Sequence, residues 1–231
     1  MIKISNLSLM KKIPEISDLD MEIREGETYV LLSTGRSATD HLVNIFLGME
    51  KNFEGSVQVE NIDILSKSES WREHLTFLSS GSEWPRDMDV GELLSFLKFN
   101  FNISETAFAE LYVKSNMERL LPKKISELKE VEWRKFLFSI CRLKKGKNFI
   151  IRDFVKGMPP DFTLEFSKGI RQMKKDLCSI LYLGDDVFFA LEIGDRIGFM
   201  KKGKLLLELP ASRMKKMNID ELYFQFLSEG G

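Results

Sequence analysis

Residues 29–48 read YVLLSTGRSATDHLVNIFLG, which is an apolar run, a turn of small residues and a segment whose apolar positions recur three and four apart. This spacing predicts a buried strand followed by an amphipathic helix that begins near residue 37. Backbone N–H groups in such a turn, and at such a helix N-terminus, can cradle phosphate groups. The turn contains no lysine, however, and Asp40 stands where a serine or threonine would hold magnesium. The stretch therefore predicts a phosphate-binding loop that has lost its ligands.

The composition is that of a folded protein. The chain has 231 residues, of which 43% are hydrophobic and 30% charged, and its formal net charge is -1. We expect one large domain with a buried core and no nucleic-acid partner. Cys141 and Cys178 lie in apolar contexts, which predicts buried free thiols in a reducing compartment. No stretch approaches the roughly 20 apolar residues that span a bilayer, and no signal peptide opens the chain, so we expect an intracellular protein.

Strand and helix patterns alternate along the chain. Helices separate several short apolar strands, so we expect an α/β protein with a mostly parallel sheet. A turn is predicted at Glu60–Asn61, between two short strands, and a helical pattern covers about 90–146. An amphipathic helix is expected to close the chain. The other strands are predicted at 2–9, 16–24, 75–79, 148–152, 179–183 and in a hairpin over 196–209.

Six stretches follow one another in a characteristic order. They are IKISNLSL (2–9), DLDMEIREGETYVLL (18–32), FLGMEKNFEGSVQVENIDI (46–64), DVGELLSF (89–96), KNFIIRDFVKGMPP (147–160) and GDRIGFMKKGKLLLE (194–208). In this order they resemble the ATP-binding subunit of ABC transporters over essentially the whole chain. The resemblance implies a P-loop NTPase-like core with a mostly parallel sheet, an antiparallel β subdomain and an α-helical subdomain inserted at about 87–145, all within one domain over 1–231.

The same resemblance implies that the phosphate loop is degenerate. Thr39 takes the place of the phosphate-binding lysine, and Asp40 takes the place of the magnesium-binding serine. Glycines are replaced at three positions, which resists the backbone conformations of a phosphate cradle. The loop comprises Ser33, Gly35, Arg36, Ser37, Ala38, Thr39, Asp40 and His41, with the glycine replacements at Ser33, Arg36 and Ala38.

Other positions that the family uses for chemistry are also changed. Arg152 replaces the metal-associated aspartate, Asp153 the general-base glutamate, and Asp185 falls near the switch histidine. Ser80 falls where a glutamine reaches the metal and the attacking water. Further replacements are Lys11 or Met10 for the aromatic residue on adenine, Pro159 for the aspartate of the loop that crosses the dimer interface, and LKEVEWR (128–134) for the glycine-rich signature that clamps the partner's ATP.

These replacements suggest what fills the old site. Ser37 and Asp40 fit a capping box that would satisfy the first N–H groups of the helix. Asp40 and Arg152 both border the metal position in the family, so we predict an ion pair between them; the alternative is that both side chains turn to solvent. Arg36 is either a substitute phosphate ligand or a solvated loop residue. We expect weak or absent binding of ATP and Mg²⁺, and no metal site.

The resemblance and its departures lead to three hypotheses for the function. The first is a non-catalytic subunit, a pseudo-ATPase, that docks a membrane-spanning transporter subunit and pairs with an active ATPase paralogue or with itself, in the cytoplasm at the inner face of the cell membrane. The second is a scaffold or regulator outside transport. The third is an unorthodox ATPase that uses Arg36 and Asp153. Trp84, Pro85 and FLKFNFN (96–102) are either docking anchors for the membrane subunit or ordinary core residues.

Overall fold

The structure is a computed structural model that describes residues 1–10, 14–33, 36–81, 85–101, 103–109, 117–144 and 146–217. Within these ranges the strands form a six-stranded sheet and a four-stranded sheet. Successive residues of β3 (Thr28–Ser33) point to opposite faces, so Val30 and Leu32 join one apolar cluster while Tyr29 and Leu31 join the other. The six-stranded sheet therefore lies between two cores.

The six-stranded sheet has the order β10-β9-β3-β8-β7-β6. The strands from β9 to β6 run parallel, and only β10 pairs antiparallel, with β9. Because they are covered on both faces, the central strands are short and continuously apolar. The remaining strands of this sheet are β6 (Leu75–Ser79), β7 (Asn148–Arg152), β8 (Ser179–Gly184), β9 (Arg196–Lys201) and β10 (Lys204–Pro210).

The four-stranded sheet is antiparallel throughout, in the order β2-β1-β4-β5. Glu60 and Asn61 have φ angles of 51° and 61° at the turn between its last two strands, where a turn is predicted. Together the two sheets confirm the predicted fold class of a mostly parallel core with an antiparallel β portion. The strands are β1 (Ile2–Met10), β2 (Pro14–Ile23), β4 (Glu54–Val59) and β5 (Ile62–Asp63).

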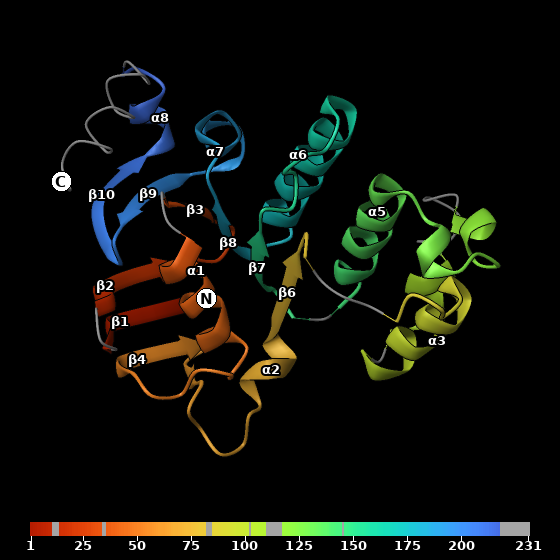
Figure 1. The fold of residues 1–231 in the computed structure, drawn as a ribbon, viewed down its shortest axis with the longest axis horizontal. Helices are drawn as coiled ribbons and strands as arrows, with labels where there is room; N and C mark the ends of the chain where they lie inside the picture. Colours follow the sequence, from red (N-terminus) through yellow and green to blue (C-terminus); the bar gives the residue numbers. More distant parts are fainter. Residues whose placement is uncertain are drawn as a thin grey trace.

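The helices cover the sheets and extend the molecule to one side. Figure 1 shows α3 and α5 at the end of the molecule opposite β1, β2 and β4. Both helices fall in the predicted range 87–145, whose boundary as a subdomain stays a prediction. The helices are α1 (Arg36–Phe46), α2 (Trp71–His74), α3 (Val90–Asn100), α5 (Glu130–Cys141), α6 (Pro160–Lys175), α7 (Val187–Ile193) and α8 (Ala211–Met214), with 3-10 turns η1 (Met117–Leu120) and η2 (Ile125–Glu127).

Several sequence expectations fall on residues that the structure does not describe. These are Lys11, Gly35, Trp84, the side chains of Met10 and Arg36, and the closing helix beyond residue 217. Over the described part of the chain, every helix is too short or too polar to cross a bilayer.

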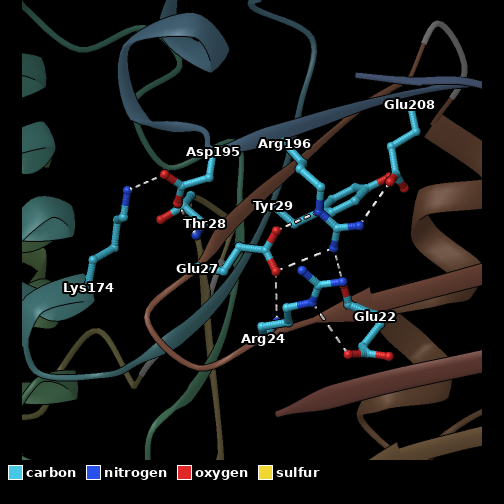
Figure 2. A network of polar contacts seen from close by, with 9 residues as sticks. All are labelled: Glu22, Arg24, Glu27, Thr28, Tyr29, Lys174, Asp195, Arg196 and Glu208. Atoms are coloured by element: carbon cyan, nitrogen blue, oxygen red, sulfur yellow. Dashed lines mark hydrogen bonds and ion pairs between the residues drawn. The ribbon is translucent and has the colours of Figure 1, made fainter. Parts of the chain in front are cut away.

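A network of charged side chains holds β3 against its neighbours (Figure 2). Arg196, at the start of β9, contacts Glu27 through Nε at 2.5 Å and Glu208 through Nη1 at 2.9 Å. The hydroxyl of Tyr29 donates to the other oxygen of Glu208 at 2.8 Å. Asp195 accepts from the N–H of Thr28 at 2.9 Å and from Lys174 at 2.6 Å, so the network ties β3 to both β9 and α6.

Both cysteines are free thiols, but only Cys178 is buried as predicted, and Cys141 is half-buried. Cys141 and three buried acids make the fold sensitive to alkali. Burial raises the pKa of the Cys141 thiol to about 12, although Lys144 opposes the shift, and burial also raises the pKa of Cys178, Tyr29 and Tyr182. Each folded-state pKa lies above its unfolded value, so each contribution to stability is complete below the unfolded pKa and is lost as the pH rises toward the folded pKa.

We therefore expect the free energy of unfolding to fall between about pH 7.5 and pH 10, with Cys141 alone contributing about 1–2 kcal/mol of the loss. Urea denaturation at the two pH values measures it. The pKa of Lys144 is lowered by burial, which acts in the opposite direction but is a single group. Cys141→Ala should flatten part of the decline. A free energy of unfolding that is constant or rises over this range contradicts the prediction.

Candidate functional site

The residues singled out from the sequence gather at one edge of the six-stranded sheet. Because β3, β8, β7 and β6 are parallel neighbours, their carboxyl ends meet there. Ser33 ends β3, Arg152 ends β7, Ser80 follows β6 and Asp185 follows β8. Ligands of open α/β sheets bind at this edge, outside the carboxyl ends of the strands. This edge is therefore the candidate site.

The predicted ion pair between Asp40 and Arg152 is confirmed. A terminal nitrogen of the Arg152 guanidinium contacts the Asp40 carboxylate, and Nε of Arg152 lies 4.0 Å from Oδ2 of Asp153. The Arg152 side chain is 21% exposed and that of Asp40 is 45% exposed, so the pair is partly screened by solvent. The centre of the edge thus holds a cation that two carboxylates of the same chain flank.

The predicted capping box at Ser37 is wrong. Helix α1 begins at Arg36, so Ser37 lies inside its first turn, and its hydroxyl donates to Oε2 of Glu15 at 2.5 Å. The carboxylate of Glu15, from β2, therefore lies beside the positive end of α1, which favours negative charge. The first turn of this helix has a carboxylate of its own chain beside it, from a strand that the sequence did not connect with it.

Three other side chains of the predicted phosphate loop contact the rest of the protein. Ala38 and Thr39 are buried, at 7% and 6% exposure. Ala38 belongs to the apolar cluster under the four-stranded sheet, and Nδ1 of His41 lies 3.1 Å from Oε2 of Glu50. These side chains are part of the packing around α1. Thr39, which the resemblance places at the phosphate-binding lysine, is thus turned into the protein.

The segment after β7 is held from several sides. Asp153 has a φ of 48°, a left-handed conformation that few residues other than glycine adopt, and its N–H donates to the carbonyl of Leu183 at 3.0 Å. Lys156, three residues further on, forms an ion pair with Asp185. Asp153 and Asp185, which the resemblance places at the general-base position and near the switch position, therefore each lie beside a basic side chain of this chain.

Arg134, from α5, anchors the same segment. Its side chain is almost fully buried and donates to the carbonyl oxygens of Phe154 at 2.6 Å and Lys156 at 2.9 Å. Its Nε also contacts Glu130 at 2.7 Å. Arg134 ends the segment that the resemblance places at the family's signature, and it joins α5 to the segment after β7 as a buried cation.

The N-terminus of α5 also carries acidic residues of its own. The N–H of Lys129 donates to Oε2 of Glu132 at 3.2 Å, and both Glu130 and Glu132 lie in the first turn. Carboxylates at this position complement the helix dipole. The resemblance implies that this helix end clamps the partner's ATP. Here its first turn carries two carboxylates of its own chain, Glu130 paired with Arg134 and Glu132 paired with Arg119.

These residues do not fit a magnesium nucleotide. A triphosphate with magnesium requires a cation at the β and γ phosphates and oxygen ligands for the metal. The edge instead offers Arg152, already paired with Asp40, and a buried Thr39. Among the described residues, no group of three or more His, Cys, Asp or Glu side chains has a geometry that could hold a metal ion.

Two of the observed contacts were missed from the sequence. Lys156 and Asp185 follow neighbouring strands, β7 and β8, so the strand order could have brought them together. The contact between Glu15 and Ser37 had no local signal, because it depends on how the two sheets lie against α1.

Comparison with known proteins identifies the fold but no sequence relative. No protein-family model matches the chain, and no curated protein shows a significant sequence match. Among solved structures, the ATP binding subunit of an ABC transporter superposes with a TM-score of 0.89 at 14% identity, over 99% of this chain and 100% of that chain. The chain has the fold of an ABC transporter ATP-binding subunit.

Other ABC cassettes match almost as well. CbiO1 from Clostridium perfringens, which is part of the ABC transporter complex cbiONQ, has a TM-score of 0.79 at 18% identity, over 98% of this chain and 94% of that chain. The dimeric bacterial ABC transporter cassette MJ0796 has a TM-score of 0.77 at 18% identity, over 91% of this chain and 99% of that chain. The ABC cassette fold therefore spans essentially the whole chain, as predicted.

Proposed function

We propose that this chain is a non-catalytic ATP-binding-type subunit of an ABC transporter complex, a pseudo-ATPase that docks a membrane-spanning subunit. The ion pair between Asp40 and Arg152 supports this most strongly, because it lies at the sheet edge where an ABC cassette binds triphosphate and magnesium. The Glu15 carboxylate beside α1 and the acidic first turn of α5 add to the argument, since they put negative charge at the two helix ends that would face nucleotide.

The partner within the complex is a second cassette, either an active paralogue or another copy of this chain. The resemblance implies a dimer of cassettes in which each nucleotide lies between the phosphate loop of one cassette and the signature segment of the other. This chain has changed both, so neither pairing gives two ordinary composite sites. We infer that the subunit serves by its shape and its contacts, as a peripheral protein at the inner face of the membrane.

Two phenylalanines on α3 suit contact with the membrane-spanning subunit. Phe96 is 55% exposed and Phe99 is 87% exposed, on a helix at the far end of the molecule from the antiparallel sheet (Figure 1). Phe96 and Phe99 are three residues apart on one helix, so they are neighbours on its surface, and aromatic residues are frequent anchors of interfaces. Because Phe99 is largely exposed, it is not a core residue, and its position favours docking.

We expect the double substitution Phe96→Ser and Phe99→Ser to abolish recovery of the membrane-spanning subunit. The test is affinity purification of the full-length chain from detergent-solubilised membranes, with stoichiometric bands identified by mass spectrometry. The substitution Leu164→Ser, at a half-exposed position of α6, is the matched control and should leave recovery unchanged. If the parent chain recovers no membrane-spanning protein, the result would favour a scaffold or regulator outside transport.

A further inference from the structure

The turn that follows β7 is folded around a buried cation. Residues 153–157 form this turn, and its first residue has a left-handed backbone conformation. The carbonyl oxygens of Phe154 and Lys156 both accept hydrogen bonds from one nitrogen of the Arg134 side chain, Nη1, at 2.6 and 2.9 Å. In an extended strand two such carbonyls would lie about 6–7 Å apart, too far for one donor. The shape of the turn and the place of Arg134 therefore depend on each other.

The burial of Arg134 requires this turn. Its side chain is 9% exposed, and an arginine is almost never buried without partners for its charge and its N–H groups. The ion-pair partner Glu130, at 2.7 Å, belongs to the same helix and is itself half-exposed. The guanidinium also lies 5.9 Å from the centroid of the fully buried Phe154 ring. The cation is thus held by α5 on one side and by the turn on the other.

One residue of the turn reaches from α5 to the candidate edge. The carbonyl of Lys156 is held by Arg134, while the amine of the same residue forms an ion pair with Asp185, after β8. A hydrogen bond is lost when its donor moves away by about 1 Å, so the turn tolerates little displacement of Arg134. The place of the Lys156 amine at the edge therefore depends on the place of α5.

We propose that the turn over 153–157 is a conformational latch that α5 closes. Arg134 is its positioning residue: while α5 holds the guanidinium in place, the turn stays closed and Lys156 stays beside Asp185. A displacement of α5 opens the turn and leaves the sheet folded. Helix α5 lies with α3 at one end of the molecule (Figure 1), so a protein bound at that end would act on the turn through Arg134. The latch rests on these contacts alone and does not depend on the proposed function.

Hydrogen–deuterium exchange of the full-length protein, followed by mass spectrometry, tests the latch. The N–H groups of Lys156 and Met158 donate within the turn at 3.1 and 3.0 Å, so a peptide over 153–158 reports its opening. Arg134→Gln should speed exchange in this peptide at least about tenfold and leave a peptide over β3 within about twofold. Arg119→Gln, which removes an exposed arginine that also pairs with α5, is the matched control and should change neither peptide.

A second pair of variants acts from the side of α5 and keeps Arg134. Glu130→Gln weakens the hold of the helix on the guanidinium and should speed exchange over 153–158 about two- to fivefold. Glu132→Gln, in the same turn of α5, should not. This comparison decides the proposal even if Arg134→Gln does not fold. Unchanged exchange over 153–158 in Arg134→Gln or in Glu130→Gln, an equal rise in the β3 peptide, or an effect of Glu132→Gln as large as that of Glu130→Gln overturns it.

Discussion

Replacing Arg196 with methionine should lower the free energy of unfolding by about 3 kcal/mol or more, because the change leaves a buried carboxylate without its partner. The Glu27 side chain is only 9% exposed, and Arg196 meets it with both Nε and a terminal nitrogen. The same guanidinium also binds Glu208 and the carbonyl of Glu22 (Figure 2). Breaking a buried pair on one side is far more costly than the pair's net stabilisation.

Urea denaturation followed by circular dichroism measures the change, which corresponds to a fall in Tm of roughly 6–12 °C for a chain of this size. Arg24→Met is the matched control, because the Arg24 side chain is 70% exposed and its contact with Glu22 is long, at 3.6 Å. Its effect should stay within about 0.5 kcal/mol.

A second variant distinguishes the cost of leaving the Glu27 carboxylate unpaired from the cost of losing the packing of the Arg196 side chain. Adding Glu27→Leu to Arg196→Met removes the stranded charge, so part of the stability should return. An Arg196→Met protein as stable as the parent, or a double variant less stable than the single one, contradicts this account of the network.

The fold was predictable because it depends on patterns that are local in the sequence. The apolar run at 29–32 and the spacing of apolar residues after it predict a buried strand and an amphipathic helix. The alternation of apolar and polar residues over 2–9 predicts a strand with one apolar face. Strands β1 and β3 are observed at the two predicted places. Their order along the chain then restricts the topology, because parallel strands need crossover helices between them.

The candidate site was predictable only where the fold itself supplied the geometry. Asp40 and Arg152 were paired because their elements, α1 and β7, meet at the same sheet edge in the family that the chain resembles. Helix α1 begins at Arg36, where a start near residue 37 was expected, so Ser37 lies in its first turn and its hydroxyl donates to Glu15. Side-chain partners between distant elements have no signal in a single sequence.

Binding of ATP with magnesium should be at least about a hundredfold weaker than in an ABC cassette that retains the loop lysine. Losing that lysine removes a charge-assisted hydrogen bond of about 1.5–3 kcal/mol. The half-exposed carboxylate of Asp40 adds repulsion of about 1 kcal/mol toward a phosphate after solvent screening. Arg152 does not compensate, because its guanidinium is already paired with Asp40 and stands where the metal would need acidic oxygens.

Isothermal titration of the purified full-length chain with ATP and magnesium, with phosphate release measured on the same sample, tests the central claim most directly. A cassette that retains the lysine, run in the same buffer, shows that the assay detects binding. We predict no saturable heat up to about 1 mM nucleotide and no phosphate release above the blank. A micromolar Kd, or turnover that Asp153→Asn abolishes, would contradict the proposal that this ABC cassette fold works without nucleotide.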